Sequence, residues 1–167
     1  YEAQKLGAEL IVSHHPLLFQ PAKQVTDGTQ DLVGQRVLML AEAGVAAICC
    51  HTNWDSAQGG VNYVLAKLCG LDNLQVLEQG GVDAQGVPYG IGRIGTLSMP
   101  VPMSDYLQLL KGSLEPNGMR YVDAGRRVYK VAVGGGSCGS MMEQVVWAGC
   151  DTFVTGDLKY DHFLDAK

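Results

Sequence analysis

Short apolar runs that end in polar or glycine-rich loops are the feature that most constrains the fold of this chain. Four such runs occur, at residues 9–13, 45–50, 128–133 and 151–154. Each is too short for an ordinary helix and has the apolar content of a buried strand. Helical patterns lie between them, over 31–44, 61–69 and 141–148, and a glycine ends or follows each one. This alternation predicts an α/β fold of largely parallel sheets flanked by helices.

The middle of the chain carries weaker signals. The pattern predicts further strands over 74–79, 91–98 and 119–123, and a helix over 105–114 that Ser104 can cap. A glycine-rich stretch at 80–90 predicts turns. We expect residues 1–167 to form one α/β domain, and we place a boundary between two lobes of it within 80–100.

Both ends of the chain resemble interrupted helices. Residues 1–7 have the pattern of a helix end that stops at Gly7, and Lys167 falls inside what reads as a starting helix. We therefore expect that the chain lacks both termini of a longer protein.

Composition excludes several classes of protein. Hydrophobic residues make up 47% and charged residues 17%, which is the balance of a globular chain. The net charge is −5, and no basic cluster exceeds the pair Arg126-Arg127, so nucleic-acid binding is not expected. No apolar stretch approaches the roughly 18 residues of a membrane span, and no signal peptide is visible. Five cysteines without a CxxC spacing fit free thiols in a reducing compartment, so we expect a cytoplasmic protein without membrane partners.

Histidines gather at the ends of the first two predicted strands. His14 and His15 follow the first run, and His51 and Asp55 follow the second. Because parallel strands share one carboxyl edge, these loops are expected to meet. Imidazole and carboxylate together suit divalent ions, so His14, His15 and Asp55 are candidate metal ligands. The alternatives are ordinary surface or core histidines, and an Asp55 that only organises a turn or cap.

Other polar side chains near these strand ends could support chemistry. His51 could hydrogen-bond a ligand or move protons, and Asp157 could act as a base or merely cap a helix. The loop at 134–139 follows a strand, so Gly136 and Ser137 could approach an anionic substrate, as could Thr155 and Gly156. A tight turn that requires glycine is the alternative. The loop matches no Walker motif, the chain has no G-x-S-x-G elbow, and nothing in the sequence indicates an activated Cys138.

Four blocks of this sequence resemble a known family. They are Ser13-His14-His15-Pro16-Leu17, His51-Thr52-Asn53-Trp54-Asp55, Gly136-Ser137-Cys138-Gly139 and Thr155-Gly156-Asp157-Leu158-Lys159-Tyr160. Their order and context are similar to those of the NGG-interacting-factor-like proteins, also named GTP cyclohydrolase 1 type 2 homologues. The match departs where many members have Gly-Ser-Gly in place of the third block, and His directly after the final Tyr. His162 is therefore an uncertain counterpart.

The resemblance implies a dinuclear metal centre. It implies two divalent ions (Zn, Fe, Mn, Ni or Mg) in a cavity between two similar lobes, with His14, His15 and Asp55 as ligands. It also implies further ligands, a His and a Glu four residues later, beyond residue 167, and a toroidal homo-hexamer.

Two functions fit these expectations. One is a metal-dependent hydrolase that acts on a small molecule, for example by opening a purine nucleotide as a GTP cyclohydrolase does. Two metals roughly 3.5–4 Å apart could activate water and polarise a carbonyl or ring carbon. The alternative is a non-catalytic metal-binding scaffold or regulatory partner protein.

Overall fold

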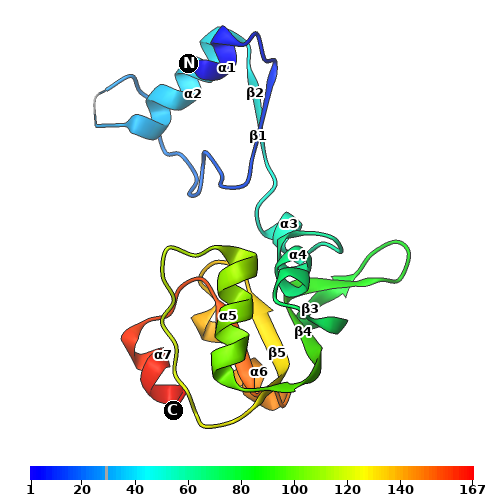
Figure 1. The fold of residues 1–167 in the computed structure, drawn as a ribbon. Coiled ribbons are helices and arrows are strands. Elements are labelled where there is room, and N and C mark those ends of the chain that lie inside the picture. Colours follow the sequence, from blue (N-terminus) through cyan, green and yellow to red (C-terminus); the bar gives the residue numbers. More distant parts are fainter. Residues whose placement is uncertain (29) are drawn as a thin grey trace. The chain divides into compact units, whose positions relative to one another are not determined.

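The fold of the chain was analysed in a computed structural model that describes residues 1–28 and 30–167. The chain divides into two compact units, Tyr1–Trp54 and Asp55–Lys167, and Figure 1 shows the elements of each. Across the described residues, every helix is too short or too polar to span a lipid bilayer.

The first unit is a two-stranded parallel sheet with two helices. In chain order its elements are α1 (Glu2–Lys5), β1 (Leu10–Ser13), α2 (Leu32–Ala43) and β2 (Ala46–Cys49). The Asp31 carboxylate accepts a hydrogen bond from the Gly34 amide at 2.7 Å and so begins α2. The helix ends at Gly44, whose left-handed φ of 63° costs other residues more. The register then places Leu10 opposite Ala46 and Ser13 opposite Cys49.

The strands of the first unit are less buried than their sequences suggest. Side chains of Ile11, Ser13 and Cys49 are half-buried, whereas Val12 is 63% exposed and Ile48 51% exposed. The expectation of fully buried strands is wrong here, because only one face of the pair is covered among the described residues. The loops that follow β1 and β2 are therefore held by a sheet with few buried side chains.

The second unit is a mixed four-stranded sheet with helices on both faces. Its order is β3-β4-β5-β6, and only the β5–β6 pairing is parallel. The strands are β3 (Asp72–Val82), β4 (Pro88–Val101), β5 (Val128–Gly134) and β6 (Thr152–Thr155). The helices are α4 (Val61–Leu68), α5 (Met103–Leu114), the short 3₁₀ turn η1 (Gly139–Met141), α6 (Met142–Trp147) and α7 (Tyr160–Asp165).

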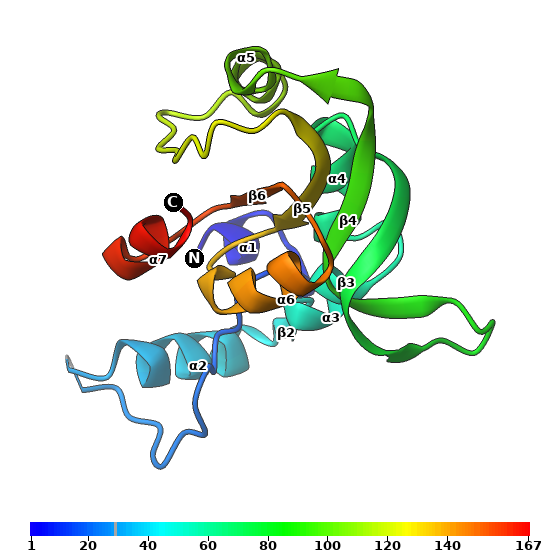
Figure 2. The same ribbon diagram turned by 90° about the horizontal axis from the view of Figure 1, so that it is seen from below.

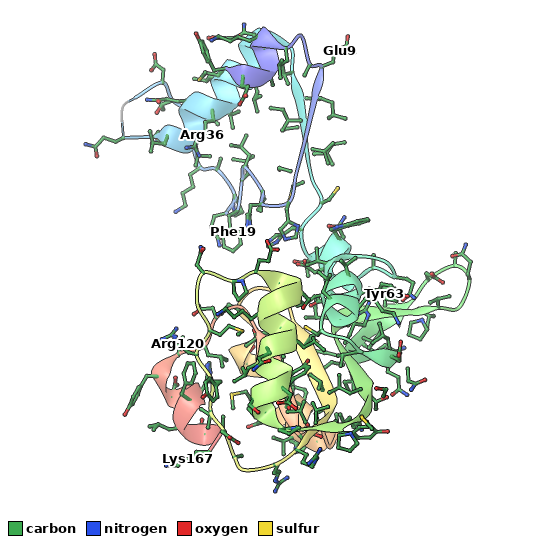
Figure 3. The ribbon with its side chains drawn as sticks, in the orientation of Figure 1. Glu9, Phe19, Arg36, Tyr63, Arg120 and Lys167 are labelled. Carbon is green, nitrogen blue, oxygen red and sulfur yellow. The ribbon has the colours of Figure 1, made fainter. Side chains whose placement is uncertain are left out.

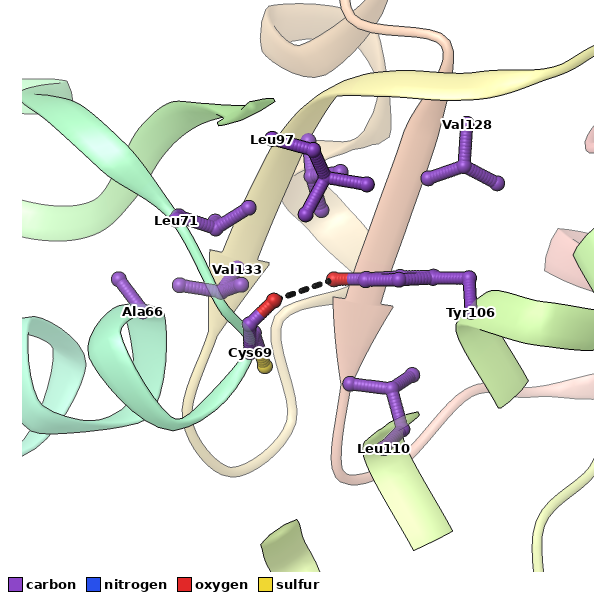
Figure 4. Close-up of a cluster of buried hydrophobic side chains, with 9 residues drawn as sticks. Ala66, Cys69, Leu71, Leu97, Tyr106, Leu110, Val128 and Val133 are labelled. Atoms are coloured by element: carbon purple, nitrogen blue, oxygen red, sulfur yellow. Dashed lines mark hydrogen bonds between the residues drawn. The ribbon is translucent and has the colours of Figure 1, made fainter. Parts of the chain in front are cut away.

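Alternation along β5 separates two hydrophobic cores. Val131 and Val133 pack on the side of α4 and α5, whereas Ala132 packs with Val145 of α6. Figure 2 shows α5 and α6 on opposite sides of β5. In the larger core the Tyr106 hydroxyl donates to the Cys69 carbonyl at 3.3 Å, as Figure 4 shows. This well-packed unit gives the loops after β5 and β6 a rigid base.

The α/β class predicted from the sequence is confirmed, with one difference in its details. Parallel pairing holds for β1–β2 and β5–β6, whereas the hairpin β3–β4 and the pair β4–β5 are antiparallel. The stretch 80–100 forms most of that hairpin, and the lobe boundary placed there stays a prediction.

Three local predictions are wrong. Ser104 does not cap α5 (Met103–Leu114), because the helix begins one residue before it, after Pro102. Residues 119–123 form no strand, because they lie in an irregular connection rich in turn-forming residues. The segment after β2, expected to be a loop, contains the short helix α3 (Thr52–Ser56). That helix determines where Asp55 lies.

Candidate metal centre

Hydrogen bonds to β2 hold the histidine pair at the end of β1. The Cys50 amide donates to the Ser13 carbonyl at 2.8 Å, and this bond extends the parallel ladder by one step. The Cys49 thiol donates to the His14 carbonyl at 3.1 Å, and the Ser13 hydroxyl donates to the His15 carbonyl at 2.9 Å. The backbone of this histidine pair is therefore tied to the same strand that leads to His51.

The His14 ring is oriented by the backbone of the neighbouring strand end. Its Nδ1 lies 3.0 Å from the Cys50 carbonyl oxygen. Because a carbonyl can only accept a hydrogen bond, Nδ1 carries the proton in this contact, which leaves Nε2 as the nitrogen that can coordinate an ion. This is the arrangement in which ligating histidines are commonly held.

Three imidazole rings gather at this edge of the first unit. The ring centroid of His14 lies 5.1 Å from that of His15 and 5.0 Å from that of His51. The His15 and His51 centroids are 5.4 Å apart. Three of the four histidines in the chain are thus neighbours, as their positions after two parallel strands predicted.

Helix α3 adds a carboxylate to the histidines. His51 directly precedes α3 and Asp55 lies four residues on, so one helical turn brings both to the same side. Ligand atoms of His14, His51 and Asp55 all lie within 4.8 Å of one another. His15, predicted as a ligand, borders this group through its ring, whereas His51, predicted to handle protons, is inside it.

The donor set fits a divalent transition metal. Imidazole nitrogens suit Zn, Fe, Mn and Ni, and a carboxylate partly neutralises the positive charge. His14 is exposed and the other two residues are half-buried, so a hydrated ion could enter. The group can therefore hold a metal, and its single carboxylate gives it one negative charge.

The glycine-rich loop after β5 meets the end of β6. The Thr155 hydroxyl donates to the Gly136 carbonyl at 3.0 Å and accepts from the Cys138 amide at 3.3 Å. The Gly156 amide donates to the same Gly136 carbonyl at 3.0 Å. Three of the predicted substrate-contacting residues, Gly136, Thr155 and Gly156, are thus brought together, and Ser137 is exposed beside them.

Neighbouring reactive side chains differ in their surroundings. Asp157 is exposed after β6. The His162 ring packs against Gly139, where even a methyl group would clash, and its Nδ1 accepts from the Lys159 amide at 3.2 Å. Burial, together with the nearby carboxylates of Asp55 and Glu78, raises the pKa of the Cys138 thiol, so a nucleophilic thiolate is disfavoured there.

A cavity of about 790 Å³ lies within the second unit beside this loop. Residues from α4, α5 and β6 line it, together with the glycine loop and the connection after α5. Its lining is mostly apolar and includes Leu65, Leu110 and Phe163, and Gly136, Thr155 and Gly156 also contribute. Arg120 is the single charged residue among the described residues that line it. The Arg120 guanidinium lies 5.3 Å from the Phe163 ring centroid, beside α7 in Figure 3.

Comparison with known families identifies the chain. The family described as Duf34/NIF3 (NGG1p interacting factor 3) matches residues 1–167. The chain belongs to this family. A Clostridium perfringens member named "GTP cyclohydrolase 1 type 2 homolog" is 33% identical over 99% of this chain. A Lactococcus lactis protein of the same name is 29% identical over 95%. The chain spans 62% and 59% of the lengths of these two relatives.

Solved structures from the Duf34/NIF3 family share the fold. A Bacillus cereus protein related to NIF3 has a TM-score of 0.83 and 24% identity, and the match covers 99% of this chain and 71% of that one. Reduced HcgD from Methanocaldococcus jannaschii has a TM-score of 0.74 and 26% identity, with coverages of 99% and 61%. The α/β arrangement is therefore that of known family members.

Two features of the site escaped sequence reasoning. His51 enters the ligand group because α3 follows it, and the only available signal was the i, i+4 spacing of His51 and Asp55. Asn62 and Arg93, both 1% exposed, contact the Asp55 segment and its continuation. Nothing in the local sequence indicates that a lone Arg in an apolar strand would reach that segment.

Proposed function

We propose that the protein is a divalent-metal-dependent hydrolase with a dinuclear centre that includes His14, His15 and Asp55. The observation that carries this proposal is the close grouping of ligand atoms from His14, His51 and Asp55. The three adjacent imidazole rings support His51 as an additional ligand. We further propose that ligands outside residues 1–167 complete the centre, since one carboxylate does not balance two divalent cations.

Different residues of the chain would hold the metal and accept the proton. A bound divalent ion would supply Lewis acidity toward a carbonyl or ring carbon and toward water. The Cys50 carbonyl holds the His14 ring so that Nε2 is available for coordination. With His51 used as a ligand, Asp157 is the proposed proton acceptor, because its carboxylate follows β6 directly beside Thr155 and Gly156.

The cavity of the second unit supports a substrate with an apolar body and an anionic group. Its lining is largely apolar, and Arg120 brings a positive charge that draws an anion. Gly136, Ser137, Thr155 and Gly156 are the proposed contacts at the loop side. A nucleotide has both features, and the curated relatives carry a cyclohydrolase name.

The test is a turnover screen with matched variants of the complete protein. Protein loaded with Mn²⁺ or Zn²⁺ is incubated with GTP, other nucleotides and phosphate esters, and bound metal is counted by elemental analysis. We expect His14→Ala and Asp55→Asn to lose both metal and turnover, while His162→Gln keeps its metal. Full metal content with no turnover would leave a non-catalytic scaffold or regulatory partner. Unchanged metal in both ligand variants would refute the centre.

We also propose a cytoplasmic homo-hexamer, supported by the family resemblance and the free cysteines. Light scattering of the purified complete protein measures the assembly directly. A monomer at micromolar concentration would contradict it.

A further inference from the structure

Asn62 is a buried amide that joins two functional segments of the second unit. It lies in the first turn of α4 and is 1% exposed. Its Nδ2 donates to the Asp55 carbonyl at 3.0 Å, and its Oδ1 accepts from the Gly135 amide at 2.7 Å. Both ends of the side chain are thus used, one on a candidate ligand's backbone and one on the glycine-rich loop.

Arg93 is a buried cation that holds the next two carbonyls. It lies in β4 and is 1% exposed. Its Nη2 donates to the carbonyls of Ser56 and Ala57, each at 3.0 Å. Its Nη1 donates to the carbonyls of Gly90 and Gly92, each at 2.8 Å, so the guanidinium connects the β4 backbone to the residues that follow Asp55.

These contacts fix three consecutive carbonyls, those of Asp55, Ser56 and Ala57. They lie at the end of α3, where a helix leaves carbonyls without partners inside the helix. Burying an arginine is costly, and the cost is offset only where hydrogen bonds satisfy it. An apolar side chain could fill the same space but could not donate hydrogen bonds to these carbonyls. The presence of Arg93 therefore indicates that the position of the Ser56–Ala57 backbone matters.

We propose that Asn62 and Arg93 are positioning residues that hold the Asp55–Ala57 backbone so that the Asp55 carboxylate is directed for metal binding. This inference rests on the proposed function, since it assumes that Asp55 is a ligand. Residues that orient ligands in this way typically contribute roughly 10–100-fold to metal affinity. Through Gly135, Asn62 also connects the same segment to the loop proposed to contact substrate.

The experiment compares metal affinity with stability in the complete protein. Asn62→Ala, Asn62→Asp and Arg93→Lys are titrated with Zn²⁺ by calorimetry, and their melting temperatures are measured without metal. Asn62→Asp keeps the acceptor for Gly135 and loses the donor to Asp55, and Arg93→Lys keeps the charge with fewer donors. The control is Asp151→Ala, which loses hydrogen bonds from the Tyr129 and Lys130 amides in the same unit.

We expect at least about a 10-fold loss of Zn²⁺ affinity in the Asn62 and Arg93 variants. We expect a change below about twofold in Asp151→Ala even where its melting temperature falls as far. Hydrogen exchange of the 55–60 amides should rise in the first group alone. Folded Asn62→Asp and Arg93→Lys proteins with parental affinity and exchange would overturn the proposal. Parental affinity in Asp55→Asn would instead refute the proposed centre, and the exchange measurement would still decide whether Asn62 and Arg93 fix the segment.

Discussion

The two units of this protein differ in what holds their side chains in place. Among the described hydrophobic residues of Tyr1–Trp54, Val45 alone is buried, at 9% exposure. The second unit contains two separate hydrophobic cores and fully buried side chains such as Leu71 and Val133. The first unit therefore depends on backbone and polar contacts, whereas the second is built on packing.

The difference matches the division of tasks in the candidate site. The proposed histidine ligands lie on loops held by hydrogen bonds to the β2 segment, such as that from Cys49 to His14, where a hydrated ion can reach them. The carboxylate of Asp55 belongs to a segment whose backbone is held by the buried side chains of Asn62 and Arg93. Accessible ligands and buried supports are thus supplied by different parts of the chain.

The largest expected effect is the contrast between a core substitution in the second unit and a strand substitution in the first. Leu71 is 1% exposed within the larger core, so Leu71→Ala should lower the free energy of unfolding by roughly 2–5 kcal/mol. Val12 is 63% exposed on β1, so Val12→Ala should change it by less than about 0.5 kcal/mol. Urea unfolding of the two variants beside the parent measures both values. A Val12→Ala effect as large as that of Leu71→Ala would show that the first unit has a core these burial values miss.

A smaller effect is the loss of stability of the second unit at alkaline pH. Burial raises the pKa of the Cys69 thiol to about 11 from an ordinary value near 9.0. The folded state therefore keeps this proton when the unfolded state has lost it. The resulting stability is fully present below pH 9 and is lost as pH rises toward 11, by about 3 kcal/mol in total.

Unfolding free energies measured at several pH values between 8 and 11 check this sign. Cys69→Ala removes the thiol but keeps the carbonyl that accepts from Tyr106, so its pH profile should be flatter than that of the parent. Burial also raises the pKa of Cys138 and Cys150, and some decline should remain in the variant. Parallel profiles for the two proteins would contradict the assignment to Cys69.

The sequence predicted those features that depend on neighbouring residues. The helical pattern over 31–44 and its end at Gly44 are confirmed by α2, which Asp31 caps. The gathering of His14, His15 and His51 follows from two short parallel strands that stop at histidines. These outcomes need only local turn chemistry and the common edge of parallel strands.

Features that depend on distant partners could not be read locally. Arg93 is surrounded in sequence by glycine and isoleucine, and its four carbonyl partners include two that lie 36 and 37 residues away. The antiparallel hairpin β3–β4 has a turn without the usual Asn-Gly signal, so its glycines were interpreted as a boundary. Which histidine joins Asp55 was decided by α3, a helix of five residues that is too short for a periodic pattern.

The smallest expected effect on the unfolding free energy is that of His14→Ala, although His14 is a proposed metal ligand. His14 is exposed, its Nδ1 lies 3.0 Å from the Cys50 carbonyl oxygen, and its ring lies beside those of His15 and His51. Without metal, His14→Ala should therefore change the unfolding free energy by no more than about 0.5 kcal/mol.

With Zn²⁺ present, the parent protein should gain stability as more Zn²⁺ is added, because an ion that binds only the folded state stabilises it. The His14→Ala variant should show no such gain. His162→Ala is the control, since its ring lies against Gly139 and outside the histidine group. Thermal melts of the three proteins at rising Zn²⁺ concentration make the comparison. An equal gain in His14→Ala would place the metal elsewhere, whereas unfolding of metal-free parent would indicate a structural ion and a first unit that cannot hold its fold without it.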